Sequence, residues 1–191
     1  MSINLVTIIL EKIHQRFKND LFRLNHILGV HRKAIELARL HKINVNKAQI
    51  ASLFHDYTKN EPLEFHLNLL PMHIINRYQK TPFIYHAFSA AIILEQEYKV
   101  KDKTILNAIR RHVWGYAKMN KLDKIIFISD KIEVNRDYPQ INYLRQLALE
   151  NLDKTVFYIL ENSINFYKNK NMIIFPEQLR VYESFKIKLR Y

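Results

Sequence analysis

Glycine is almost absent from this chain, which limits the folds available to it. Only Gly29 and Gly115 occur among 191 residues. Tight β-hairpins rely on glycine where φ is positive, so a sheet-rich fold is disfavoured. The same scarcity excludes a glycine-rich phosphate loop and a dinucleotide-binding fingerprint. Apolar residues instead recur at helical spacing, which predicts an all-α fold.

Polar caps and the apolar repeat indicate where the helices lie. Residues that favour helix N-termini precede several apolar stretches: Asn19 or Asp20, Asn44 or Asn46, and Asp102. Pro62 and Pro71 each suit the first turn of a short helix. Apart from the two short helices at Pro62 and Pro71, the predicted helices span residues 5–17, 21–41, a segment ending near 55, 85–98, 105–111, 121–129, 141–150, 152–167 and 177–189. We expect one helical-bundle domain over residues 1–191, with a core at about 20–185 and an N-terminal helix, 3–17, packed on it.

The composition limits the cellular compartments and the binding partners that we expect for this chain. The chain has no cysteine, which excludes disulfides and thiolate metal sites and fits a reducing, cytoplasmic protein. We expect no transmembrane helix and no signal peptide, since the apolar runs are too short. The net charge of +12 suits either nucleic acid or a polyphosphate substrate. Its lysines are scattered, however, which favours a general compositional bias and makes nucleic acid an unlikely partner.

An adjacent histidine and aspartate, His55 and Asp56, end the apolar run that begins at Ala51. The pair offers one nitrogen and one oxygen ligand, a mixture that divalent transition metals accept. Four more candidate ligands are spread along the chain: His26, His86, His112 and Asp130. Any one of them alone is best interpreted as a satisfied core histidine or a helix cap. Six on inward faces are better explained by one shared metal centre.

The order of these six residues resembles the HD-domain superfamily of metal-dependent phosphohydrolases, in the version with two metals. Longer segments resemble one subfamily, the bacterial YqeK-type symmetrical diadenosine tetraphosphatases: residues 25–30, 53–59, 107–112, 124–133 and 135–139. The resemblance covers roughly residues 20–185. Three departures bear on loop geometry and substrate preference: Val113-Trp114-Gly115 after the fourth histidine, Lys131 after the last aspartate, and Asn135 before Arg136.

The resemblance implies the all-α HD-type fold, two divalent transition-metal ions and Asp56 as a bridging, catalytic ligand. Iron is the first expectation, with manganese or zinc as alternatives, because imidazole and carboxylate suit all three. The implied reaction is symmetrical hydrolysis of diadenosine tetraphosphate to two ADP by hydroxide held at the metals. The expected partner is therefore a small dinucleoside polyphosphate; a homodimer is left open.

Four basic side chains are candidates for binding the phosphates. Lys59 lies three residues beyond Asp56 and is expected to act both in catalysis and in binding a phosphate oxygen. Arg136 is expected to grip phosphate, although a surface arginine paired with Asp137 is the alternative. Arg23 and Arg110 are weaker candidates, and Arg110 has a solvent-facing alternative.

Several alternatives stay open at this point. Trp114 and Tyr116 could stack on an adenine ring, with core packing at least as favoured. His66 and His73 lie in the segment 62–82, which could cover the site as a lid. The whole chain could hydrolyse another nucleotide, or could be a basic RNA-binding helical module that needs no convergent ligands.

Overall fold

Side-chain caps begin most of the long helices. The computed structural model of the chain describes residues 4–189. Asn4 caps α1 (Leu5–Arg16), Asp20 caps α2 (Leu21–Leu40) and Asn44 caps α3 (Val45–Phe54). Later caps are Asp102 for α7 (Lys103–Arg111), Asn120 for α8 (Lys121–Ile132) and Asn151 for α10 (Leu152–Asn169). Each of these side chains accepts a backbone N–H that would otherwise lack a partner.

The remaining helices complete an arrangement without strands in residues 4–189. They are α4 (Leu63–Leu69), α5 (Met72–Tyr78), the short 3₁₀-helix η1 (Pro82–Ile84), α6 (Tyr85–Glu97), α9 (Ile141–Glu150) and α11 (Pro176–Lys188). The all-α prediction is confirmed. In residues 4–189, no helix combines the length and apolar character that a membrane crossing requires.

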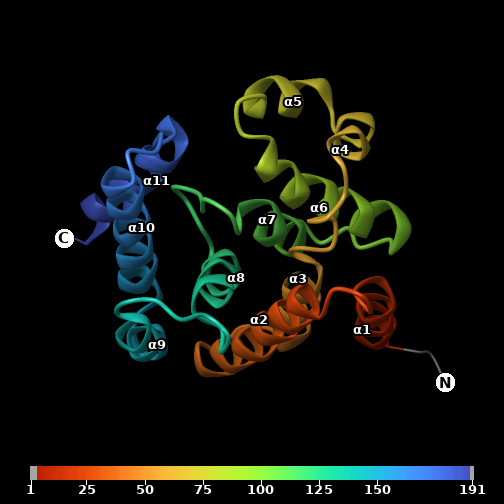
Figure 1. Cartoon of the computed structure of the whole chain (residues 1–191). Helices are drawn as coiled ribbons and strands as arrows, with labels where there is room; N and C mark the ends of the chain where they lie inside the picture. Colours follow the sequence, from red (N-terminus) through yellow and green to blue (C-terminus); the bar gives the residue numbers. More distant parts are fainter. Residues whose placement is uncertain (1–3, 190–191) are drawn as a thin grey trace.

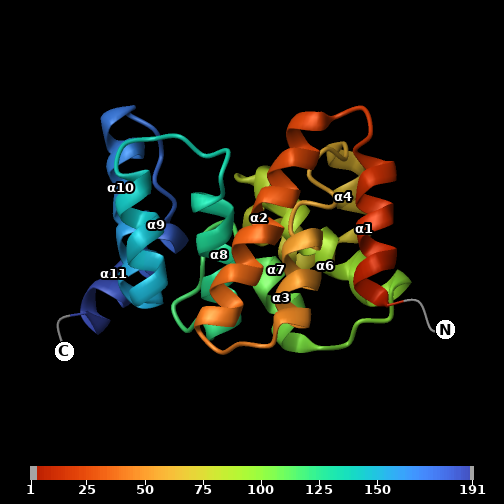
Figure 2. The same ribbon diagram turned by 90° about the horizontal axis from the view of Figure 1, so that it is seen from below.

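A central group of helices, α2, α3, α7 and α8, holds the main core. Helix α8 contacts α2, α7 and α10, so it is surrounded by other helices (Figures 1 and 2). Its apolar run from Ile125 to Ile128 is fully buried, as expected for a helix without a solvent-facing side. Helices α9 and α10 cover one side of α8, α11 packs against α10, and α1 lies beside α3 at the opposite end of the molecule (Figure 2).

A smaller apolar cluster joins α5 and α6 to the start of α11. Leu70, Tyr78, Tyr85 and Trp114 are buried in it, and Phe175 stacks on Trp114. The segment with α4 and α5 lies over α6 (Figure 1).

The structure corrects some predicted details. Pro62 and Pro71 occupy the N-cap positions of α4 and α5, one residue before the first turn. The short 3₁₀-helix η1 was not predicted. Helix α8 continues to Ile132, three residues beyond the predicted end, because the apolar pattern resumes there with a fully buried side chain. The predicted N-terminal helix begins at residue 3, which lies outside the described residues; α1 itself packs in the main core through Ile9 and Ile13.

Candidate metal centre

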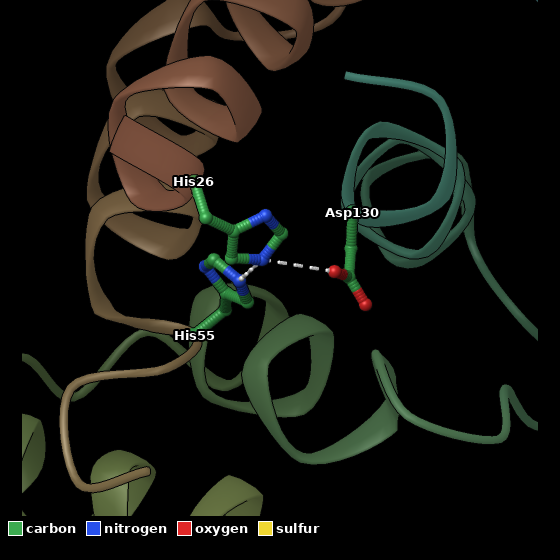
Figure 3. Close-up of side chains that lie close together, drawn as sticks. All are labelled: His26, His55 and Asp130. Carbon is green, nitrogen blue, oxygen red and sulfur yellow. Dashed lines mark hydrogen bonds and ion pairs between the residues drawn. The ribbon is translucent and has the colours of Figure 1, made fainter. Parts of the chain in front are cut away.

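Five elements bring the six candidate ligands to one buried place. His26 lies in α2, His86 lies in the first turn of α6, and Asp130 lies in the last turn of α8. His55 and His112 are the residues directly after α3 and α7. All six candidate ligand residues, including Asp56, are at most 6% exposed. Figure 3 shows His26, His55 and Asp130 pointing toward one another from three different segments.

The imidazoles form two pairs. The Nε2 atoms of His26 and His55 are 3.3 Å apart, and those of His86 and His112 are 3.2 Å apart. Asp130 Oδ1 lies 3.2 Å from His26 Nε2, so it belongs to the first pair. The donor atoms of His26, His55 and Asp130 all lie within 4.8 Å of one another, as do those of His55, Asp56 and His112.

Asp56 lies between the two pairs and offers one oxygen to each. Its Oδ1 is 3.1 Å from His86 Nε2 and 3.5 Å from His112 Nε2. Its Oδ2 is 3.7 Å from the Nε2 atoms of both His26 and His55. This is the placement expected of a carboxylate that bridges two ions.

Backbone carbonyls fix the orientation of three of the imidazoles. His55 Nδ1 donates to Ser52 O (2.6 Å), His86 Nδ1 to Phe83 O (2.6 Å) and His112 Nδ1 to Ile109 O (2.7 Å). A carbonyl only accepts, so each Nδ1 must carry the hydrogen, and in the neutral ring each Nε2 then presents a lone pair inward. Each carbonyl lies three residues before its histidine, so the local chain conformation supplies this support.

His26 is oriented differently, by a distant carboxylate. Its Nδ1 donates to Glu133 Oε1 at 3.2 Å. The other oxygen, Glu133 Oε2, accepts from the backbone N–H (2.7 Å) and side-chain amide (3.0 Å) of Asn135. Gly29 makes room for this carboxylate, since a Cβ there would overlap with Glu133 Oε2. Asn135, one of the departures from the subfamily pattern, therefore helps hold the group that orients His26.

The protonation states of the centre suit a cation. Burial lowers the pKa of His55 to about 3 and that of His86 to about 4, although Asp56 opposes both shifts. Burial raises the pKa of Asp56, but His55, His112 and His86 outweigh it and hold that pKa well below its usual range. Lys131 and His26 likewise outweigh burial and depress the pKa of Asp130. Neutral imidazoles and ionised carboxylates are the forms that bind metals.

The donor set fits two divalent ions. Two imidazole lone pairs facing each other at 3.2–3.3 Å repel when no proton or cation lies between them. Nitrogen and oxygen ligands of this kind suit Fe, Mn or Zn. His26, His55 and Asp130 with one oxygen of Asp56 would hold one ion, and His86 and His112 with the other oxygen would hold the second.

Basic side chains adjoin the centre. Arg23 Nη1 contacts Asp56 Oδ2, and Arg23 Nε is buried without a hydrogen-bond partner among the described residues. Lys59 Nζ lies 3.3 Å from His86 Nδ1, and burial lowers the pKa of the Lys59 ammonium group. Arg136 Nη2 donates to Asp130 Oδ1 at 3.0 Å. Arg136 is thus paired with Asp130, not with Asp137, the alternative considered above.

Arg110 has different surroundings. Its ion-pair partner is Glu95, at 3.7 Å, and it lines a separate pocket with Arg77 and Trp114. The structure therefore does not bring it to the centre with the other three basic residues. The helical spacing already favoured this outcome, because residues two apart on a helix, such as Arg110 and His112, do not face the same side.

Of the two candidate stacking residues, Trp114 is buried in the smaller apolar cluster against Phe175 and Phe83, so core packing accounts for it. Tyr116 lies under the guanidinium of Arg111. His66 is buried and its Nδ1 lies 3.0 Å from Ser89 Oγ, whereas His73 is exposed.

Sequence reasoning missed three residues near the centre. Glu133 orients His26, and Lys131 contacts Asp130. Arg145 donates to the carbonyls of Ile132 (3.0 Å), Glu133 (2.8 Å) and Arg136 (2.9 Å), so it holds the turn that carries Glu133 and Arg136. Glu133 stands inside a segment that matches the subfamily, which was the available signal. For Arg145 the sequence offered none.

An all-helical fold with two imidazole pairs around one shared carboxylate defines a candidate dinuclear metal site. The HD domain family model matches residues 23–135, which include all six candidate ligands. The symmetrical bis(5'-nucleosyl)-tetraphosphatase of Bacillus subtilis is 34% identical over 165 residues, 84% of this chain and 87% of the relative. The protein with that name from Staphylococcus aureus is 31% identical over 161 residues, 82% of this chain and 83% of the relative.

A solved structure is also similar. A crystal structure from Clostridium acetobutylicum, described as a predicted HD superfamily hydrolase involved in NAD metabolism, has a TM-score of 0.82 and 28% identity. The match covers 93% of this chain and 97% of that one. The chain belongs to the HD domain family, in the branch that contains the symmetrical bis(5'-nucleosyl)-tetraphosphatases. Membership of this family implies binding of divalent metal ions.

Proposed function

We propose that this protein hydrolyses diadenosine tetraphosphate symmetrically, with one water consumed and two ADP released. The observation that carries the proposal is the position of Asp56. The two oxygens of this single carboxylate face separate imidazole pairs. The names of the relatives supply the substrate class. A basic RNA-binding module is not favoured, because it would have no use for six convergent buried ligands.

The proposed cofactor is a pair of divalent transition-metal ions, with iron as the first choice and manganese or zinc as alternatives. When bound, such ions supply positive charge to phosphoryl oxygens and lower the pKa of a water molecule. We assign metal binding to the six residues described above. Asp56 would fix the spacing of the two positions, and Glu133 would keep His26 in the orientation that binding requires.

The basic side chains would bind and orient the phosphate chain. Lys59 offers a compact charge beside His86, and we assign it a role in both binding and turnover. Arg136 can move from Asp130 to a phosphate oxygen, since its side chain is partly exposed. The buried Nε of Arg23, which has no hydrogen-bond partner within residues 4–189, is a further donor at the same place. Together they would neutralise charge that develops as the central anhydride bond breaks.

The decisive experiment is product analysis. Purified protein loaded with Fe²⁺, Mn²⁺ or Zn²⁺ is incubated with diadenosine tetraphosphate in ¹⁸O-labelled water. The products are separated, and their masses are measured by mass spectrometry. We expect ADP alone, with one label for every two ADP molecules formed. AMP together with ATP would reject symmetrical cleavage, and no turnover by protein that carries two ions per chain would reject the substrate.

We also propose that the whole chain is one domain. The main core includes buried residues from Val6 in α1 to Phe185 in α11, so both ends of the described chain contribute to one cluster.

A further inference from the structure

A second concavity lies beside the centre, between α10 and the loop that follows α8. Its volume is about 640 Å³, within the range of small-molecule sites. One wall is the segment from Lys131 to Gln140, and the other is the C-terminal half of α10. In Figure 2 this loop crosses from α8 to the α9–α10 pair at the top of the molecule.

Two basic residues connect this pocket to the centre. Lys131 and Arg136 both line it, and both also contact the carboxylate of Asp130. A phosphate chain held at the centre would therefore pass these two cations on its way to the pocket. Tyr138 donates to Lys131 O at 3.0 Å, and burial raises the pKa of this phenol to about 12, so it remains a neutral donor.

One face of α10 supplies the opposite wall. Most residues on this face are polar, which is unusual for a helix face that turns toward another part of the chain. The residues of α10 that line the pocket recur at helical spacing, and they include Asn162, Ser163, Phe166 and Asn169. They continue the stripe that begins with the buried Ile159. Phe166 is 55% exposed. Asn162 donates to Gln140 across the pocket at 3.3 Å, so two side-chain amides lie together there.

The chemistry of these walls matches a nucleoside. An exposed aromatic ring offers a stacking surface for a base. A side-chain amide offers the paired donor and acceptor that an adenine edge complements. We infer that this pocket binds one nucleoside of the substrate, with the purine ring on Phe166 and its edge toward the amides of Asn162 and Gln140. The inference rests on the proposed function for the identity of the ligand.

Binding of two related anions tests the pocket separately from turnover. ADP contains the nucleoside, whereas inorganic pyrophosphate has only the two phosphates. Dissociation constants for both are measured by calorimetry on metal-loaded wild-type protein and on Phe166→Ala. We expect Phe166→Ala to weaken ADP binding about tenfold, within the range for loss of a base–aromatic stack, and to leave pyrophosphate binding unchanged. Phe166→Tyr should restore ADP binding, because it retains the ring.

Tyr143→Ala is the matched control, since Tyr143 is an aromatic residue on α9, 51% exposed and outside the pocket lining. It should bind both anions as wild type does. Unchanged ADP binding in folded Phe166→Ala would overturn the inference, as would an equal loss of ADP and pyrophosphate binding. Failure of the proposed function is a different result: wild-type protein would release no ADP from diadenosine tetraphosphate, while the ADP–pyrophosphate comparison would still give its own answer.

Discussion

At the scale of single residues, Asp56 has the largest predicted effect. Asp56→Ala removes the carboxylate shared by both imidazole pairs. We expect loss of both metal ions and a fall in kcat of at least about a thousandfold, because charge stabilisation at the phosphoryl group is lost with them. Metal analysis, circular dichroism and the ADP-release assay measure the outcome. The helical spectrum should be kept; a metal-free variant with full activity would reject the site.

Lys59 is expected to act on the substrate and not on the metals. Its Nζ lies beside His86, but the imidazole is already held by the carbonyl of Phe83. Lys59→Ala should keep two ions per chain and lower kcat/KM by about tenfold to a hundredfold, as expected for one lost charge contact to phosphate. Lys80→Ala, on an exposed surface lysine, is the control. An unchanged kcat/KM would return Lys59 to the scattered lysines of the surface.

Glu133 should tune metal affinity without binding a metal itself. Glu133→Gln removes the charge that makes His26 a better ligand, and its one amide oxygen can face either His26 Nδ1 or the donors of Asn135, but not both. We expect metal affinity to fall about tenfold to a hundredfold. Competition with a chelator measures it, and Glu36→Gln, an exposed glutamate on α2, is the control. Equal affinities in the two variants would contradict the assigned role.

At the scale of elements, the turn after α8 depends on one guanidinium. Arg145, on α9, donates to four carbonyls of this turn, those of Ile132, Glu133, Val134 and Arg136. Arg145→Met keeps much of the apolar stem but removes the donor to the carbonyls of Ile132 and Arg136, whereas that of Glu133 still accepts from the backbone N–H of Arg136. We expect a loss of about 1–3 kcal/mol in the free energy of unfolding, measured by urea denaturation. Because this turn carries Glu133 and Arg136, kcat/KM should fall as well.

Arg145→Lys provides the comparison, since a lysine ammonium cannot reproduce the planar fork that reaches several carbonyls at once. It should recover only part of the lost stability. A fully stable Arg145→Met protein would show that the turn holds its conformation without the guanidinium.

Helix positions could be predicted from the sequence where local chemistry decides them. Of the predicted caps, Asn19 or Asp20, Asn44 or Asn46, and Asp102, the structure uses Asp20, Asn44 and Asp102, and a helix begins after each one. The six candidate ligands could be selected from their order and residue types. Glu133 and Arg145 could not, because their roles depend on partners brought together by packing: Glu133 meets His26 107 positions away in the chain. The position of Arg110 away from the centre, by contrast, agrees with its spacing of two residues from His112.

At the scale of the whole molecule, metal binding should stabilise the fold. The candidate ligands come from five separate segments, α2, the end of α3, α6, the end of α7 and α8. An ion that binds only the folded arrangement adds about 2.7 kcal/mol when its free concentration is 100 times Kd. Removing the ions with EDTA should therefore lower Tm, and adding them back should restore it. An identical Tm for stripped protein and for protein with two ions per chain would contradict this.

The two ends of the candidate centre are supported by different parts of the chain. The ring nitrogens of His55, His86 and His112 are fixed by carbonyls of their own neighbourhood, whereas His26 depends on Glu133 and so on the α8–α9 turn. Loosening of that turn would disturb one ion position and spare the other. Partial unfolding from the C-terminal third should then yield a half-loaded species, with the His86–His112 position the last to empty.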